Sequence, residues 1–321
     1  MRKYWVKVHD LREVKRSVRV LRYYKEIRYA LVEASKGDID SLLKAGVISS
    51  VSRPTKVQTA SDGLNPLEEG MVELDKLRMY GHDPRDERRV KVAVLDSGVW
   101  VGHPFFRGKR VIRRSFVNEG PDDLYGHGTG VSGIVLDGAD FTLYHGKVLN
   151  RKGYGYDLNV LDGLRWAVRA GVHVINLSLR TDNDDENSPI GEMIRYAVRR
   201  GVTVVCSAGN LGPGRMKVPA KMSETITVGA LNRDGEVAGF SSTWRNKPDV
   251  YAPGVDVKIP FVGRNLFIRA SGTSFATPFV TRAVGYLIAL TGVRKPSLLK
   301  QAIRKTALVR EVVRAEQARY N

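Results

Sequence analysis

Residues 161–177, LDGLRWAVRAGVHVINL, indicate the fold class of this chain. The first ten carry apolar side chains at helical spacing, and Val172 to Leu177 continue as an apolar run of strand length. The same order returns in residues 190–207, where a helical pattern leads into Val202 to Ser207. Buried strands that alternate with helices predict an α/β domain with a mostly parallel central sheet and helices on both faces.

The flanking segments extend this pattern in both directions. Val90 to Leu95 read as an earlier strand of the sheet, and Thr273 to Leu290 as a long, mostly apolar, buried helix. A basic C-terminal tail, from about residue 294 to 321, predicts one or two amphipathic helices over residues 297–305 and 308–319.

The first 60 residues form a smaller unit. Their patterns follow the order β-(α)-β-β-α-β, which predicts an α+β, ferredoxin-like layer. The expected strands are residues 4–8, 18–23, 28–34 and 47–52, with a short turn or helix at 9–16 and a helix at 38–44 capped by Asp38. Residues 54–70 are rich in Pro, Gly, Ser, Thr and Asn and predict an exposed linker or an extended segment. We therefore expect one domain at 1–60 and a second at 61–321.

The composition excludes several classes of protein. Hydrophobic residues make up 42% and charged residues 27% of the chain, which is typical of globular proteins rather than of disordered or fibrous ones. The apolar run 279–290 is too short to span a bilayer and contains Arg282. The basic N-terminus lacks the apolar stretch of a signal peptide, which favours a cytoplasmic location. The single cysteine, Cys206, excludes an intramolecular disulfide and is expected in the core.

The formal net charge of +18 suggests an anionic partner, such as nucleic acid. The excess is unevenly distributed: residues 1–60 hold 14 basic and 6 acidic side chains, and residues 294–321 hold 8 and 2. The long middle of the chain is nearly balanced. A solvated basic surface is the simpler interpretation of such runs, and an anionic partner for the C-terminal tail stays open.

Three residues have the types and positions of a catalytic group. An acidic residue ends an apolar strand at Asp96, a histidine lies among glycines at His127, and a serine opens an apolar helix at Ser274. Singly, each is an ordinary turn, loop or capping residue. Together, the order Asp, His, Ser is one of the known orders of a nucleophilic triad on a parallel sheet. Asn210 adds an amide just beyond a strand end.

With these residues, the chain resembles the subtilisin (subtilase) family of serine endopeptidases over about residues 70–310. The matching segments are VAVLDSGV at Asp96, GHGTGVSGIV at His127, VINLSL before the expected substrate strand, SAGN at Asn210, SGTSFATPFV at Ser274, and the connecting segments VPAKMSETITVGAL and FSSTWRNKPDVYAPGV. Residues 1–60 resemble the inhibitory propeptide of that family. The resemblance implies a subtilisin-like catalytic domain at 61–321.

The resemblance implies a role for each of these residues. Ser274 would attack the scissile carbonyl and form an acyl-enzyme, His127 would act as its base, and Asp96 would orient His127. Asn210 and the backbone N–H of Ser274 would bind the oxyanion. Two alternatives are a catalytically idle scaffold of the same fold and a binder of anionic surfaces that uses the basic ends.

The resemblance also implies that a polypeptide substrate binds as a strand between two extended segments. The implied substrate-binding residues are Gly153, Tyr154, Gly155, Ser178, Leu179, Arg180, Ala208 and Gly209. The family usually has two glycines where this chain has Arg180-Thr181, followed by the acidic loop 182–186. Arg180 would narrow the pocket, favour acidic substrate residues or pair with that acidic loop, and we favour the last.

Self-processing is implied for the N-terminal domain. The cut would fall in the region Gln58, Thr59, Ala60, Ser61 and Asp62, and the released domain would act as an intramolecular inhibitor. The alternative is a permanent accessory domain. Because the family is mostly exported, an extracellular location is the alternative to a cytoplasmic one.

We expect no cofactor. Many members of the family bind calcium through an Asp after His-Pro and an Asn-rich loop. Here His103-Pro104 is followed by Phe105-Phe106, and the segment 135–140 is too short for that loop. A hard cation needs six or more oxygen ligands, so we expect no calcium at the usual family position.

Overall fold

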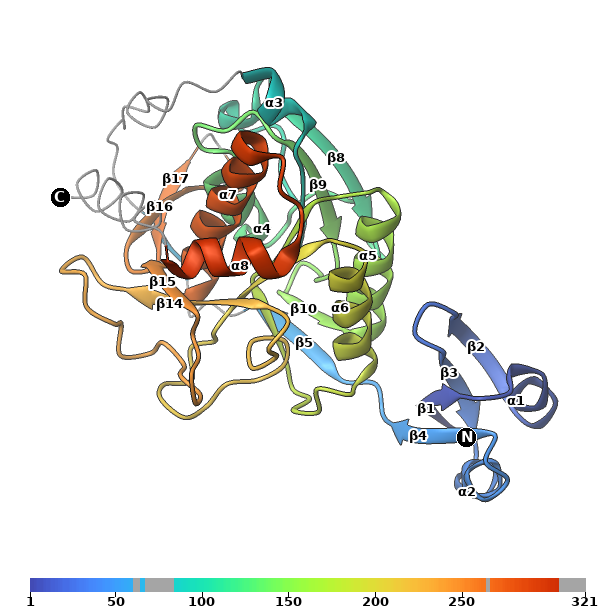
Figure 1. Ribbon diagram of the computed structural model, residues 1–321. Coiled ribbons are helices and arrows are strands. Elements are labelled where there is room, and N and C mark those ends of the chain that lie inside the picture. The colour runs from blue at the N-terminus through green and yellow to red at the C-terminus, as the bar shows by residue number, and fades with distance from the viewer. Residues whose placement is uncertain (60–63, 67–83, 264–265, 306–321) are drawn as a thin grey trace.

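A seven-stranded sheet forms the centre of the molecule (Figure 1). The computed structural model describes residues 1–59, 64–66, 84–263 and 266–305. The sheet has the order β15-β14-β13-β11-β7-β9-β8, and all neighbouring strands are parallel. Its strands are β7 (Lys91–Asp96), β8 (Arg110–Ser115), β9 (Thr142–Lys147), β11 (Val174–Leu177), β13 (Thr203–Ser207), β14 (Ile226–Leu231) and β15 (Val250–Pro253). The predicted parallel sheet is confirmed.

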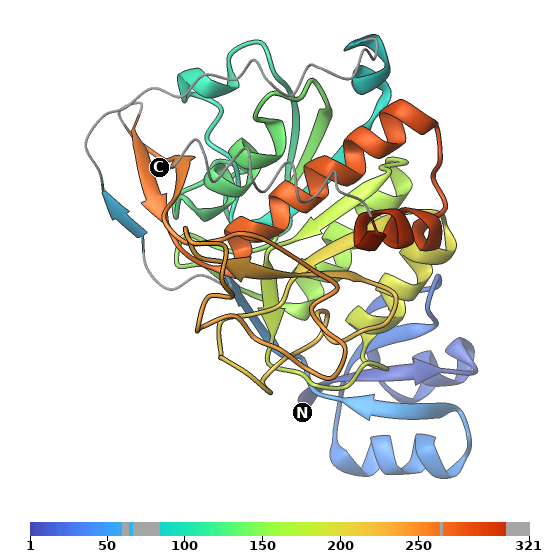
Figure 2. The same ribbon diagram turned by 60° about the vertical axis from the view of Figure 1, so that its left-hand side comes forward.

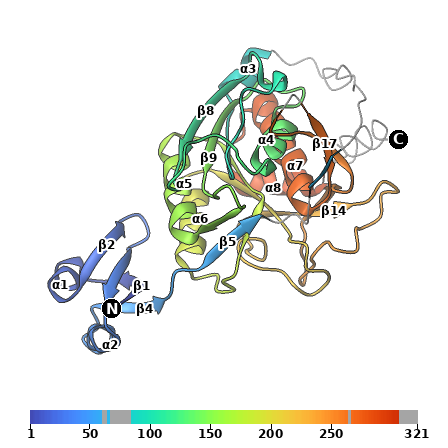
Figure 3. The same cartoon turned by 180° about the vertical axis from the view of Figure 1, so that it is seen from behind.

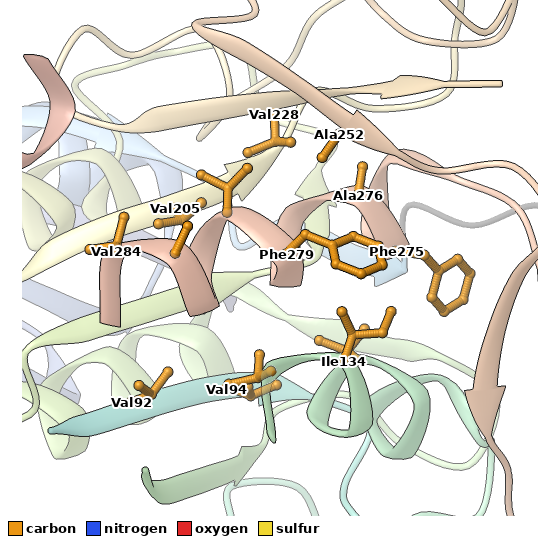
Figure 4. Close-up of a cluster of buried hydrophobic side chains, with 14 of the residues drawn as sticks. Val92, Val94, Ile134, Val205, Val228, Ala252, Phe275, Ala276, Phe279 and Val284 are labelled. Carbon is orange, nitrogen blue, oxygen red and sulfur yellow. The ribbon is translucent and has the colours of Figure 1, made fainter. Parts of the chain in front are cut away.

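Helices cover both faces of this sheet because side chains alternate along each strand. On β7, Val92 and Val94 pack with α4 (His127–Leu136) and α7 (Thr273–Thr291), whereas Ala93 and Leu95 pack with α5 (Asp157–Arg169) and α6 (Pro189–Arg199). Figure 4 shows the first of these two clusters gathered between β7, α4 and α7. The two faces therefore have separate cores.

Helix α7 crosses the first core almost completely buried, as its apolar sequence predicts. Gly285 lets it lie close to the sheet, because a Cβ there would come within 2.7 Å of the Phe141 ring. Arg282 is the one charged side chain inside the helix, and its Nη1 donates to the carbonyl oxygens of Asp137 at 2.7 Å and Ile134 at 3.2 Å. These bonds satisfy the buried guanidinium at the end of α4.

Two short helices flank this domain. Helix α3 (Pro84–Arg89) precedes β7, and η2 (Pro104–Phe106) is a single 3₁₀ turn. Helix α8 (Pro296–Lys305) confirms the first helix predicted for the basic tail. Its Lys300 pairs with Asp249 at 3.2 Å, so this part of the tail is packed on the domain. The second predicted helix, 308–319, lies outside the described residues.

The N-terminal residues form a separate antiparallel layer with the predicted element order and the sheet order β2-β3-β1-β4. Its elements are β1 (Arg2–Val8), α1 (Leu11–Ser17), β2 (Arg19–Tyr24), β3 (Tyr29–Ala34), α2 (Lys36–Lys44) and β4 (Ile48–Ser52). The predicted cap Asp38 is wrong. Ser35 caps α2, and Asp38 is the third helical residue, whose carboxylate accepts from the Ser35 N–H in a capping box. Figures 2 and 3 show this layer outside α5 and α6, away from α7.

The segment that follows this layer is more ordered than its composition predicts. Residues 56–59 form strand β5 (Lys56–Thr59), which inserts between β10 (Tyr154–Tyr156) and β12 (Leu179–Thr181) with antiparallel pairing on both sides. A little further on, β6 (Leu64–Pro66) pairs with β17 (Phe267–Ala270), beside β16 (Val257–Pro260). Of the two alternatives for residues 54–70, the extended segment is correct at residues 56–59 and 64–66, and an exposed linker is wrong for residues 56–59, because pairing with two other strands holds them in place.

In the described part of the chain, no helix taken alone is long and apolar enough to cross a membrane. Helices α7 and α8 reach the length and apolar composition of a membrane span only when they are counted together, and the chain bends by 111° between them.

The core around β9 gives a test of the fold. Leu143 is fully buried there, so Leu143→Ala should lower the free energy of unfolding by about 2–5 kcal/mol through lost contacts and a residual cavity. Urea unfolding of a Ser274→Ala background measures the change without interference from the predicted nucleophile. Leu124→Ala, at a side chain that is 54% exposed, is the matched control and should change it little. Equal effects of the two substitutions would contradict this packing.

Candidate active site

Three elements carry the residues of the predicted triad. Asp96 is the last residue of β7, His127 the first of α4, and Ser274 the second of α7. All three side chains are fully buried. Because β7 and its parallel neighbours end at the same edge of the sheet, the helices that pack on one face begin there too. The three predicted residues are therefore placed along one edge of the sheet, where Asp96 and His127 are in direct contact.

Asp96 and His127 form the closest contact of this group. Asp96 Oδ1 lies 2.8 Å from His127 Nδ1 and also accepts the backbone N–H of Ser97 at 2.7 Å. An ionised Asp96 can only accept, so it places the imidazole proton on Nδ1 and leaves Nε2 as the basic nitrogen. Within the described residues, Nε2 has no hydrogen-bond partner. His127 is therefore held in the tautomer that can take up a proton.

Ser274 lies beside Ser178 through a reciprocal pair of hydrogen bonds. Its Oγ donates to the carbonyl oxygen of Ser178 at 3.2 Å, and the Ser178 hydroxyl donates to the carbonyl oxygen of Ser274 at 2.8 Å. Asn176 Nδ2 donates in turn to the Ser178 hydroxyl at 2.9 Å. The start of α7 is thereby fixed to the strand segment expected to bind substrate. The Ser274 hydroxyl thus bonds to Ser178 rather than to His127. Catalytic hydrogen bonds often form or tighten only when substrate binds, so this geometry is compatible with the predicted role of Ser274.

Asn210 is oriented by Thr273, the residue before the serine. Its Oδ1 accepts from the Thr273 backbone N–H at 3.0 Å and from the Thr273 hydroxyl at 2.9 Å. The same hydroxyl accepts the Gly209 N–H at 3.1 Å. Because Oδ1 is held by Thr273, the amide nitrogen Nδ2 points the other way and can donate to a substrate oxygen. The N-terminus of α7 adds positive potential at the same place.

Asp123 joins the loop after Asp96 to the start of α4, and sequence reasoning missed it. Its Oδ1 accepts from the Ser97 hydroxyl at 3.0 Å, and its Oδ2 accepts from the Thr129 hydroxyl at 2.7 Å. The Ser97 hydroxyl accepts the Gly128 N–H at 2.9 Å. The available signal was an Asp four residues before His127, in a turn that leads into a helix. These bonds fix the separation of Asp96 and His127.

His145 of β9 makes a hydrogen bond with each of its ring nitrogens and, being neutral, accepts one of them and donates the other. Its Nε2 accepts from the Gly98 N–H at 3.2 Å, and its Nδ1 lies 2.9 Å from the Ser132 hydroxyl. Burial lowers the pKa of His145 to about 3. The carboxylate of Asp96 opposes this shift, and the positive charges of Lys147 and Arg113 add to it. The neutral ring therefore supports the loop after Asp96 without adding charge beside the triad.

The predicted substrate segments flank a strand of the protein's own chain. In β5, Gln58 is paired with Tyr154 on one side and Arg180 on the other, and Thr59 is paired with Leu179 (Figure 1). Gly153 also contributes, because its carbonyl oxygen accepts the Thr59 N–H at 3.3 Å. In the predicted processing region, Ala60, Ser61 and Asp62 lie outside the described residues.

A small pocket adjoins β12. It brings together the predicted Leu179, Arg180, Ala208 and Gly209 with residues that sequence reasoning did not assign, namely Ser207, Leu211, Arg215, Lys217, Val218, Pro219 and Ala220. The expected pairing of Arg180 with the acidic loop is not what the structure shows. In that loop, Asp184 pairs with Lys217 at 2.9 Å and Lys221 at 3.4 Å, while the Arg180 guanidinium faces Gln58.

Comparison with known proteins agrees with this geometry. Residues 87–319 match the profile of the subtilase family. The chain belongs to the subtilase family. It is 30% identical over 305 residues to the thermostable alkaline protease of Halalkalibacterium halodurans, covering 90% of this subtilase and 79% of that protein. It is 32% identical over 248 residues to the intracellular serine protease of Paenibacillus polymyxa, covering 68% and 74% respectively.

A third relative is subtilisin-like protease 3 of Pseudogymnoascus destructans. It is 33% identical over 263 residues, which cover 76% of this chain but 64% of that protein, slightly less than two thirds of its length. By family, the chain is a subtilisin-like serine endopeptidase. In the described residues, no three His, Cys, Asp or Glu side chains are grouped so as to hold a metal ion. The expectation about calcium stays a prediction.

His145 gives this subtilase a specific pH dependence of stability. Its folded pKa of about 3 lies below the ordinary value of 6.5, so the unfolded chain binds the proton first. The contribution of His145 to the free energy of unfolding is therefore fully present above about pH 6.5 and is lost as the pH falls toward 3. His145→Gln should flatten the stability curve in this window, as measured by urea unfolding at pH 4.5 and 7 in a Ser274→Ala background.

A matched histidine provides the control for this experiment. His173 is half-buried, and burial lowers its pKa to about 4, so His173→Gln should remove a smaller part of the same dependence. A His145→Gln curve that runs parallel to that of the parent would contradict the assignment.

Proposed function

We propose that this subtilase hydrolyses peptide bonds through Asp96, His127 and Ser274. The observation that carries the proposal is the 2.8 Å contact between Asp96 Oδ1 and His127 Nδ1, at the sheet edge where α7 begins with Ser274. His127 Nε2 would take the proton of the Ser274 hydroxyl as Oγ attacks the scissile carbonyl carbon. The Asn210 amide and the Ser274 backbone N–H would stabilise the negative oxygen that forms.

The second half of the reaction uses the same groups. The protonated His127 would donate its proton to the leaving amine as the carbon–nitrogen bond breaks, which leaves an acyl ester on Ser274. A water molecule, deprotonated by His127, would then release the new carboxylate and restore the serine. Asp96 remains ionised and stabilises the imidazolium in both steps. No contact among the described residues favours a catalytically idle scaffold over this reaction.

We further propose that the N-terminal layer inhibits the enzyme it precedes. It docks on α5 and α6 through buried and charged contacts rather than through the triad. The Tyr24 hydroxyl donates to Asp162 Oδ1 at 2.8 Å, and Trp5 Nε1 donates to Asp157 Oδ2 at 2.8 Å. Glu26 Oε1 accepts from Arg165 at 2.9 Å and Arg169 at 3.0 Å. This docking supports the placement of β5 in the substrate cleft.

The register of β5 supports a proposal for the bond cut in self-processing. Thr59 is paired with Leu179, and the residue before Leu179 is Ser178, whose carbonyl oxygen accepts from the Ser274 hydroxyl. In an antiparallel pair, one further step along β5 corresponds to one step back along β12. The next residue of the chain is Ala60, so we propose that Ser274 attacks its carbonyl and cleaves the Ala60–Ser61 bond.

Mass spectrometry of the purified chain tests the reaction and this bond together. Incubation should yield a fragment that ends at Ala60 and one that begins at Ser61, because Ser274 would attack the Ala60 carbonyl. A fluorophosphonate probe should label the product at Ser274. Ser274→Ala should remain a full-length, unlabelled chain. An intact, unlabelled parent would contradict the proposed activity, whereas cleavage at another bond would contradict only the register.

Glu26 tests the inhibitory docking. Its side chain is 8% exposed between two arginines, so Glu26→Gln should weaken docking about tenfold by removing the charge from these hydrogen bonds. The lag before peptide hydrolysis should shorten accordingly. Glu13→Gln is the control, because the exposed Glu13 pairs with Arg16 inside α1. Equal lags for both variants would show that this contact does not restrain the enzyme.

A further inference from the structure

The cleft of this subtilase contains an arginine aimed at one side chain of the bound strand. Arg180 lies in β12 directly opposite Gln58 of β5. With the Gln58 amide oxygen turned toward Arg180, that oxygen accepts from Arg180 Nε at 3.0 Å and from its Nη2. Two adjacent N–H groups of the guanidinium therefore converge on one neutral oxygen. This edge of a guanidinium matches the two oxygens of a carboxylate.

The surroundings of Arg180 leave its charge available to the bound strand. In the loop after β12, Asp184 forms ion pairs with Lys217 and Lys221. Among the described residues no ion pair involves Arg180, and Arg215 and Lys217 line the cavity next to it. On the far side of Gln58, β10 presents Tyr154, which is 50% exposed and uncharged. In β12 and β10, the residues directly opposite Gln58 are thus the basic Arg180 and the neutral Tyr154.

We propose that Arg180 makes this subtilase select polypeptides with a glutamate at the position of Gln58, which is the third residue before the cleaved bond. The inference rests on the proposed peptidase function and deepens it. Glutamate has the same length as glutamine and offers two charged oxygens to Nε and Nη2. A charge-assisted, bidentate contact is stronger than the neutral one that Gln58 makes. The substrate class is therefore acidic peptide segments.

This selection also affects inhibition. The protein's own strand carries Gln58, the neutral counterpart of the preferred residue, so it fills the cleft without forming the strongest contact with Arg180. A substrate strand with glutamate has an advantage over it at this position. The N-terminal segment is thus suited to leave the cleft when acidic substrates are present.

Matched peptides test the proposal on the processed enzyme. The peptides share the sequence of residues 56–62, KVXTASD, with Glu, Gln or Lys at X. For the parent enzyme, kcat/KM should be about tenfold higher for Glu than for Gln, and lower for Lys than for Gln. The Glu-to-Gln ratio should decrease as salt increases, because part of this contact is open to solvent.

Variants of Arg180 assign the preference to its charge. Arg180→Gly should bring the Glu-to-Gln ratio close to one, Arg180→Lys should retain part of it, and Arg180→Glu should favour the Lys peptide. Arg107→Gly, at an exposed arginine outside the cleft strands, should keep the full ratio. The comparison of peptides on the parent enzyme needs no variant, so it stands even if a substitution impairs folding.

The outcomes separate this inference from the function on which it rests. Equal rates for the Glu and Gln peptides, with an enzyme that a fluorophosphonate labels, would overturn the role of Arg180 and leave the peptidase function intact. A Glu preference that survives Arg180→Gly would overturn it too. Failure to hydrolyse any peptide, without labelling of Ser274, would overturn both. A tenfold preference lost in Arg180→Gly and reversed in Arg180→Glu supports the proposal.

Discussion

Parallel pairing in the central sheet is the constraint on which the site depends. Because neighbouring strands run in one direction, β7, β11 and β13 end at one edge, where Asp96, Ser178 and Asn210 follow or close them. Helix α7 is buried against the same sheet, which places Ser274 at that edge. The buried core and the geometry of the proposed site therefore depend on the same packing, and damage to the packing of α7 would also displace the proposed nucleophile.

Sequence patterns predicted those features that local chemistry determines. The helix and strand in residues 161–177 follow from the spacing of apolar side chains, and Asp96, His127 and Ser274 stand out by residue type and order. An extended segment was predicted at residues 54–70, but the pairing of β5 was not, because Lys56–Thr59 contain one apolar residue and their conformation comes from two other strands. Asp123 was missed for a related reason, since its bonds to Ser97 and Thr129 join segments that only the fold brings together.

Some of the excess basic residues form ion pairs with acidic residues of the same chain. Lys7 and Arg22 of the N-terminal layer pair with Glu192 and Asp162, and Lys300 of α8 pairs with Asp249. Contacts of this kind account for some of the basic side chains at the ends of the chain. Net charge describes solubility and long-range attraction rather than the fold, and here the individual pairs carry more information than the sum of +18.

The inserted strand connects the proposed inhibition with the proposed substrate selection, because both would use the same cleft. Backbone pairing with β10 and β12 is open to almost any sequence, so discrimination must come from side chains, which alternate in direction along a strand. Val57 and Thr59 are buried against the enzyme, whereas Gln58 turns toward Arg180. The size of a side chain is therefore restricted at the positions of Val57 and Thr59, whereas at the position of Gln58 its charge affects binding through Arg180. The protein's own segment, with the neutral Gln58, fits the shape of the cleft but lacks the charged contact with Arg180 that we propose for a substrate glutamate.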